Sequence, residues 1–161
     1  MIKLQNRLNN LNEVNILLNL QDVSVDIVTS LCGKKIGSGS TRTVYEYNLK
    51  PKKMVVKIEP MNTDNNYQEY LIWNAVRYLT KDLAWVKDWF APIHYCSPNN
   101  KILIMERTYQ TNKPKPTQIP KFLTDIHGKN FGWIGNKFVC HDYGFIFPFV
   151  KYEKKFQEVN W

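Results

Sequence analysis

The stretch VYEYNLKPKKMVVKI, residues 44–58, decides the fold of this chain. Two short runs of β-branched, aromatic and apolar residues flank a polar segment, Asn48–Lys53. This pattern predicts two antiparallel strands joined by a turn. Along the second run, alternation puts the side chain of Lys57 on the opposite face from Val56 and Ile58. A lysine in such a strand either faces solvent or reaches inward towards an anionic ligand, and both interpretations are open.

The segments outside this stretch complete an α+β pattern. An N-terminal helix is expected because apolar residues recur at helical spacing, at Leu4, Leu8, Leu11, Val14 and Leu18. A second helix is expected over about Asn66–Thr80. The remaining expected elements are strands at Phe90–Tyr95 and Lys101–Thr108 around the turn Ser97–Asn100, an extended connector at Thr111–Pro120, and a hairpin of Phe131–Ile134 and Lys137–His141 around Gly135-Asn136.

Composition limits the classes of function. The chain has 161 residues and a formal net charge of +8, which favours an anionic partner such as nucleotide phosphate, nucleic acid or an acidic protein surface. The lysines are dispersed rather than gathered in one block, which argues against nucleic acid. No apolar run is long enough to span a bilayer, and the three cysteines have no CxxC spacing. A cytoplasmic protein without membrane contact is therefore expected.

A glycine-rich segment precedes the first strand-like run. It reads Gly37-Ser38-Gly39-Ser40 and is closed by Val44. Closely spaced glycines between strands let the backbone approach a ligand and point N–H groups at phosphate oxygens. The alternative interpretation is an ordinary turn, since no Walker or Rossmann pattern is present.

Glu69 is the expected partner of Lys57. It shares the apolar face of the second predicted helix with Ile72 and Val76, and a carboxylate there requires a cationic partner. A capping box formed by Asn66 and Glu69 is an equally weighted alternative.

The segment Leu123–Asn130 contains Asp125 and Asn130, and Asp142-Tyr143-Gly144 follows the predicted hairpin. The hairpin should fold back and bring Asp142 near the other two. Two carboxylates and one amide form an oxygen-rich group of the kind that Mg²⁺ prefers. The alternative is that Asp125 and Asn130 cap a loop and that Asp142 begins a simple turn.

In order and spacing, these motifs resemble those of the protein-kinase superfamily from about Lys35 to Gly144. The resemblance implies ATP and Mg²⁺ as cofactors and a kinase-like N-lobe with an antiparallel sheet and one main helix. It implies a glycine-rich loop at Gly37, Ser38, Gly39, Ser40 and Val44, a phosphate-pairing Lys57 held by Glu69, a hinge at Met105-Glu106, a catalytic Asp125, and metal ligands at Asn130 and Asp142.

Departures from the family pattern limit what the resemblance implies. Arg42 replaces the third glycine of the loop, and Leu123-Thr124 stands where the family has His-Arg. The sequence Asp-x-His-x-x-Asn, with His127, is similar to that of aminoglycoside phosphotransferases and kinase-like proteins of tailed phages. Few residues follow Gly144, so we expect a strongly reduced second lobe. The expected organisation is an N-terminal helical segment at 1–30, the N-lobe at 31–109, and the linker, catalytic loop, metal-binding hairpin and tail at 110–161.

Three functions are consistent with these features. The first is an ATP- and Mg²⁺-dependent phosphotransferase of the protein-kinase type, in the host cytoplasm if the chain is viral. Ser or Thr of a target protein is the favoured acceptor, and Tyr, the protein itself and a small molecule stay open as alternatives. The second is an inert kinase-like binding or inhibitory protein. The third is a nucleic-acid-binding protein, whose affinity would fall steeply with salt.

Overall fold

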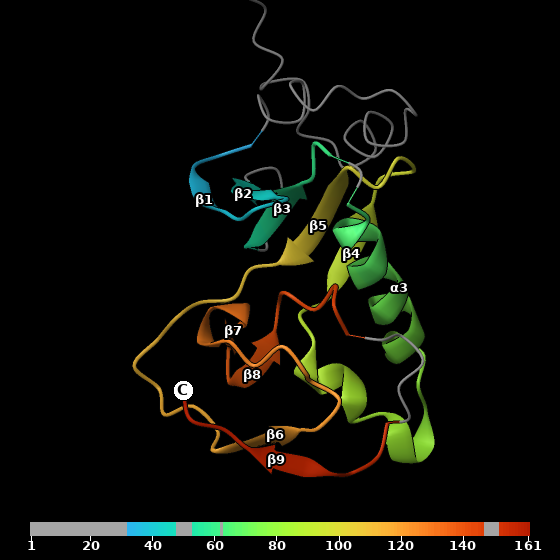
Figure 1. Ribbon diagram of the computed structural model, residues 1–161, viewed down its shortest axis with the longest axis vertical. Coiled ribbons are helices and arrows are strands. Elements are labelled where there is room, and N and C mark those ends of the chain that lie inside the picture. The colour runs from blue at the N-terminus through green and yellow to red at the C-terminus, as the bar shows by residue number, and fades with distance from the viewer. Residues whose placement is uncertain (1–31, 48–52, 62, 147–151) are drawn as a thin grey trace, which may run out of the picture. The chain divides into compact units, whose positions relative to one another are not determined.

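The computed structural model of the chain describes residues 32–47, 53–61, 63–146 and 152–161 (Figure 1). The predicted N-terminal helix and most of the turn predicted at Asn48–Lys53 lie outside these residues. The strands are β1 (Lys35–Ser38), β2 (Thr43–Tyr47), β3 (Met54–Ile58), β4 (Ile93–Cys96), β5 (Ile102–Glu106), β6 (Gln118–Pro120), β7 (Phe131–Ile134), β8 (Lys137–Cys140) and β9 (Phe156–Glu158). The helical elements are α3 (Asn65–Arg77) and the short 3-10 helices η2 (Lys81–Leu83), η3 (Val86–Trp89) and η4 (Gly128–Asn130).

Contacts divide the chain into two compact units. Unit 1 comprises the chain up to Asn66 together with Ile93–Glu106, and unit 2 comprises Tyr67–Pro92 together with Arg107–Trp161. The predicted division into segments 1–30, 31–109 and 110–161 stays a prediction.

Unit 1 is built on a five-stranded sheet with the order β1-β2-β3-β5-β4 (Figure 1). All its strand pairs are antiparallel. With α3, the sole α-helix of the described residues, the sheet confirms the predicted α+β class. Strand β3 is buried at every position, as its nearly continuous apolar sequence requires of a strand covered on both faces.

One face of this sheet forms an apolar core. Met54, Val56 and Ile58 of β3 pack there with Ile102 and Ile104 of β5 and with Tyr47. Lys57 therefore lies on the opposite face, which confirms the alternation predicted from the sequence. Its side chain is only 4% exposed, so the solvent-facing interpretation of Lys57 is wrong.

The first residues of helix α3 are hydrogen-bonded to the buried carboxylate of Glu59. Glu59 Oε1 accepts the backbone N–H of Thr63 at 2.9 Å and of Asn65 at 3.3 Å, as well as the Thr63 hydroxyl. Its Oε2 accepts the N–H of Asn66 at 2.8 Å. The anion thus binds N–H groups that have no partner within the first turn. The capping-box interpretation of Asn66 and Glu69 is wrong, because Glu59 takes the Asn66 N–H.

Unit 2 contains the predicted hairpin. Strands β7 and β8 pair in register from Phe131 opposite Cys140 to Ile134 opposite Lys137, which leaves Gly135-Asn136 as the turn. Gly135 has φ of 59°, a left-handed conformation that glycine adopts without strain. At Gly132, a Cβ would lie 2.8 Å from the Cβ and Oγ1 of Thr108, so that position has room only for glycine.

The connector differs from its prediction at one end. Its last residues form β6, which pairs with β9 from Gln118 opposite Glu158 to Pro120 opposite Phe156. The sequence predicted the extended conformation of these residues but not their pairing with β9. The C-terminal Trp161 is also part of the structure: its ring packs edge-on against Phe131 and Phe138, and its Nε1 donates to the Pro116 carbonyl at 2.6 Å.

Candidate functional site

The candidate phosphate-binding residues of unit 1 form one row across the sheet. Gly37 pairs with Val44, Val44 with Lys57, and Lys57 with Leu103. Residues directly opposite each other in antiparallel strands present their side chains on the same face. Val44 and Lys57 therefore share the sheet face opposite the apolar core, and the glycine loop begins at the end of the same row.

The loop between β1 and β2 is closed by its own hydrogen bonds. The N–H of Gly39 donates to the Arg42 carbonyl at 2.8 Å, and the Ser38 and Thr43 hydroxyl oxygens are 3.2 Å apart. Ser38, Gly39 and Ser40 are exposed. A Cβ added at Gly37 would meet nothing within 4 Å, and at Gly39 only the Arg42 carbonyl at 3.9 Å. The packing of the protein therefore does not itself require glycine at either position.

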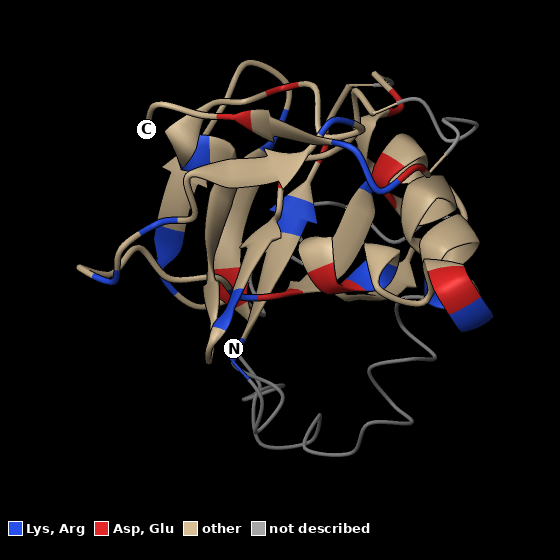
Figure 2. Ribbon diagram, turned by 90° about the horizontal axis from the view of Figure 1, so that it is seen from below, with Lys and Arg blue, Asp and Glu red and all other residues tan. Residues whose placement is uncertain are grey.

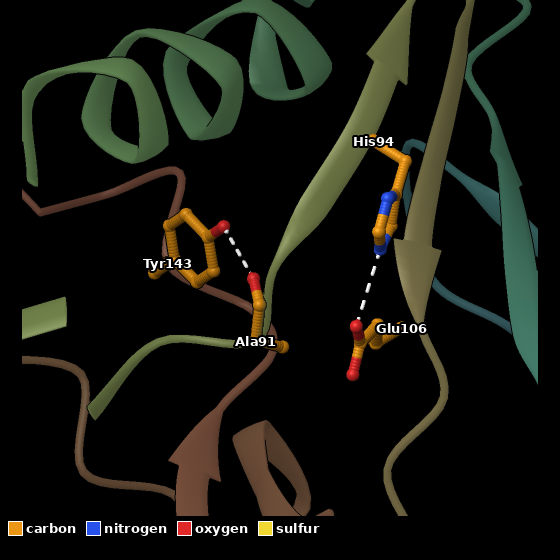
Figure 3. Close-up of polar contacts among 4 residues, drawn as sticks. All are labelled: Ala91, His94, Glu106 and Tyr143. Carbon is orange, nitrogen blue, oxygen red and sulfur yellow. Dashed lines mark hydrogen bonds and ion pairs between the residues drawn. The ribbon is translucent and has the colours of Figure 1, made fainter. Parts of the chain in front are cut away.

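The predicted hinge residues lie at the end of β5. Met105 pairs with Val55, so it lies on the same sheet face as Lys57, and its side chain is fully buried. The Oε1 of Glu106 lies 3.2 Å from His94 Nε2 (Figure 3). This contact joins the side chain of Glu106, the last residue of β5, to β4.

In unit 2, Glu69 is fully buried and contacts the Asp142-Tyr143-Gly144 segment. Its Oε1 accepts the backbone N–H of Tyr143 at 3.2 Å. The Tyr143 hydroxyl donates to the Ala91 carbonyl at 2.9 Å (Figure 3). The Tyr143 ring packs edge-on against Phe90 with centroids 5.0 Å apart. Tyr143 is 1% exposed. Its buried side chain and its N–H thus hold the segment that carries Asp142.

The three candidate residues of the catalytic loop and hairpin meet at Asn130. The Asn130 Nδ2 donates to Asp125 Oδ2 at 2.8 Å and to the Asp125 carbonyl at 3.3 Å. The Asn130 carbonyl accepts the N–H of His141 at 2.8 Å and of Asp142 at 3.4 Å. The end of the hairpin therefore returns to the loop, as predicted. A hydrogen bond of 2.8 Å between Thr108 Oγ1 and His141 Nδ1 supports the residue next to Asp142.

The side chains predicted to bind a metal carry hard oxygen atoms. Asn130 Nδ2 donates to Asp125 Oδ2, and the Asn130 amide oxygen and the Asp142 carboxylate are both of the ligand type that Mg²⁺ prefers. Among the described residues, no three or more His, Cys, Asp and Glu side chains form a metal-binding group. A pair of protein ligands suits Mg²⁺, whose shell is commonly completed by waters and phosphate oxygens.

The candidate residues divide between the two units. Gly37 to Ser40, Val44, Lys57, Met105 and Glu106 belong to unit 1, whereas Glu69, Asp125, Asn130 and Asp142 belong to unit 2. Within each unit the structure brings the candidates together as described. The ion pair predicted between Lys57 and Glu69 would join the units and stays a prediction.

Several buried polar residues of unit 1 were not singled out as functional from the sequence. Glu59 is 2% exposed, Asn66 is fully buried and Arg42 is 9% exposed. For Glu59, the sequence held one local signal of this role. Its carboxylate comes directly after an apolar strand, at Glu59-Pro60, and shortly before the start of a predicted helix. Nothing in the sequence pairs Arg42 with a residue of α3.

The positive charge is spread over many segments. Figure 2 shows Lys and Arg, in blue, on strands and loops of the described residues rather than along one element. This distribution matches the dispersed pattern of the sequence, and within the described residues it does not form the concentrated stripe typical of a nucleic-acid interface. In the part of the chain that the structure describes, no helix has the length and apolar character needed to cross a membrane.

Comparison with known proteins gives no family assignment. The chain matches no protein-family model and no curated protein sequence.

Proposed function

We propose that this protein is an ATP- and Mg²⁺-dependent phosphotransferase of the kinase type, acting on a Ser or Thr hydroxyl of a protein. The observation that carries the proposal is the meeting of Asp125, Asn130 and Asp142 through the hydrogen bonds of Asn130. The buried Lys57, in register with Val44 and the glycine loop, supports it from unit 1.

Each group has a role that follows from charge and position. The loop from Gly37 to Ser40 would bind the phosphates through its backbone N–H groups, and Lys57 would neutralise their charge. Met105 and Glu106 would bind the adenine. Asn130 and Asp142 would hold Mg²⁺, which would neutralise the phosphate charge that develops during transfer.

The acceptor side of the site is formed by Asp125. Its carboxylate is exposed and is oriented by the side chain of Asn130. In this position it would orient the acceptor hydroxyl and accept its proton, while the γ-phosphorus bonds to the hydroxyl oxygen, its bond to the β–γ bridging oxygen breaks and ADP leaves. Glu69 positions the metal-binding segment through the N–H of Tyr143 and is the proposed partner of Lys57.

The proposal is tested first by nucleotide binding and then by turnover. At a Mg-ATP concentration 100-fold above Kd, the native state gains about 2.7 kcal/mol. For a chain of this length we expect the melting temperature to rise by roughly 5–10 °C. Mg-AMP, which lacks the β- and γ-phosphates, should give a smaller rise, and so should ATP with EDTA.

Incubation with γ-labelled ATP and a bacterial lysate should then label protein on Ser or Thr. No stabilisation by Mg-ATP would contradict the proposal at the binding step. Stabilisation without any transferred label would instead identify a kinase-like binding protein that does not turn over.

The glycine at position 37 gives a separate test of the loop. Gly37→Ala should weaken Mg-ATP binding about tenfold, because a methyl group would stand between the backbone and the phosphates. Its free energy of unfolding should change by less than about 0.5 kcal/mol, because the added Cβ meets no protein atom. Titration calorimetry and thermal denaturation measure the two quantities.

Gly135→Ala is the matched control for this substitution. The left-handed φ of 59° at Gly135 should make alanine destabilising there by about 1 kcal/mol, with no effect on nucleotide affinity. If both alanine variants bind Mg-ATP as the wild type does, the loop does not contact the phosphates.

A further inference from the structure

A network of buried polar groups joins the glycine loop to the first turn of α3. The Nη1 of Arg42 donates to Asn66 Oδ1 at 3.4 Å, and Asn65 Nδ2 donates to Thr41 Oγ1 at 3.1 Å. Arg42, Asn65 and Asn66 are 9%, 8% and 0% exposed. Polar groups buried this deeply stabilise the fold only when they form hydrogen bonds. A buried polar group without a hydrogen-bond partner lowers the free energy of unfolding.

The amide of Asn66 reaches two further segments. Its Nδ2 donates to the Asn100 carbonyl in the β4–β5 turn at 3.0 Å and to the Lys57 carbonyl at 3.4 Å. The amide oxygen of Asn66 therefore contacts the loop residue Arg42, and its amide nitrogen contacts the backbone of the buried Lys57. One side chain thus couples the glycine loop to Lys57.

The first turn of α3 is itself held in place by Glu59. The carboxylate binds the N–H groups of Asn65 and Asn66, and the N–H of Glu59 donates to the Lys101 carbonyl at 2.8 Å. Asn66 is consequently fixed by its backbone as well as by its side chain. A group held in this way is a rigid point from which a loop can be positioned.

We propose that Arg42 and Asn66 are positioning residues that hold the glycine loop in a fixed place relative to Lys57 before any nucleotide binds. Fixing the loop in advance removes the entropy loss of ordering it around phosphates, and so strengthens binding. The expected gain in affinity for ATP rests on the proposed function, whereas the fixed position of the loop does not. Arg42 stands at the third position of the glycine pattern, where a glycine would leave the loop without this contact.

Amide hydrogen exchange in the full-length chain without nucleotide tests the fixing of the loop. The Gly39 N–H, bonded to the Arg42 carbonyl, reports directly on loop opening. Arg42→Ala should speed its exchange about tenfold, since it removes a buried hydrogen bond from a charged donor. The amide exchange rates of β3 and β5 should rise only by the factor that corresponds to the fall in the free energy of global unfolding.

Two further variants sharpen this measurement. Thr41→Val keeps the shape of the side chain but removes the acceptor of the Asn65 bond, and should speed Gly39 exchange about threefold. Thr41→Val therefore tests the same prediction if the Arg42→Ala variant does not fold. Arg77→Ala removes an exposed arginine at the far end of α3, beside Tyr78, and should leave Gly39 exchange unchanged.

Steady-state kinetics separate positioning from a general structural role. Arg42→Ala should raise KM for ATP about tenfold and change kcat less than threefold, as expected when only binding is weakened. Equal exchange at Gly39 in the wild type, Arg42→Ala and Thr41→Val would overturn the inference. So would an acceleration spread evenly over all of unit 1. If the wild type neither binds nor uses ATP, the proposed function fails, and the exchange data still decide whether the loop is fixed.

Discussion

Replacing Asp142 by alanine is expected to reduce the proposed phosphoryl transfer by about 1000-fold or more, because it removes the carboxylate proposed to hold Mg²⁺. Its backbone N–H, which donates to the Asn130 carbonyl at 3.4 Å, remains in the variant. The neighbouring Tyr143 keeps its bonds to Glu69 and Ala91. The fold of unit 2 should therefore persist, which circular dichroism and thermal denaturation can verify.

Two controls make this result specific. Asp142→Asn keeps the size of the side chain but removes its charge, and should lose nearly as much activity. Asp82→Ala removes an exposed carboxylate of η2 in the same unit and should retain wild-type activity. Transfer of labelled phosphate at the wild-type rate by Asp142→Ala would refute the assignment of Asp142 as a metal ligand.

Glu59→Ala should give the largest loss of stability, about 3 kcal/mol in the free energy of unfolding. The substitution leaves the N–H groups of Thr63, Asn65 and Asn66 without the carboxylate that binds them, at a site only 2% exposed. For a chain of this length, such a loss corresponds to a fall in melting temperature of roughly 10 °C. Chemical denaturation followed by tryptophan fluorescence and circular dichroism measures it.

The control for this prediction is Glu158→Ala, which removes the same charge from an exposed position of β9. It should change the free energy of unfolding by less than about 0.5 kcal/mol. Glu59→Gln keeps one acceptor oxygen and should be intermediate. Equal stability of Glu59→Ala and Glu158→Ala would show that the carboxylate does not anchor α3.

The secondary structure was largely predictable because its signals are local. The hairpin follows from Gly135-Asn136 between apolar runs, and the observed register leaves those two residues as the turn. The helix was expected over about Asn66–Thr80 and is observed at Asn65–Arg77. Alternation alone placed Lys57 on the face opposite Val56 and Ile58.

The candidate site was predictable in part, for the same reason. Asp125 and Asn130 are close in sequence, and the hairpin that returns Asp142 to them has a turn that can be recognised. Whether Lys57 faced solvent or the interior was not decided by its strand, because burial depends on what covers a sheet face. The partner of Glu69 was also open, and the bond to the Tyr143 N–H joins residues far apart in the sequence.

By itself, the sequence determined the α+β class, the positions of the strands around Lys57 and the oxygen-rich group at Asp125, Asn130 and Asp142. Only the tertiary structure decided that β6 pairs with β9, that Glu59 anchors α3, and that Arg42 reaches Asn66. Alternation, helical periodicity and turn residues act between near neighbours, whereas the β6–β9 pairing and the Arg42–Asn66 bond join segments far apart in the sequence. The role of Glu59 is local in sequence, but it depends on which buried polar groups must be satisfied once the chain has packed.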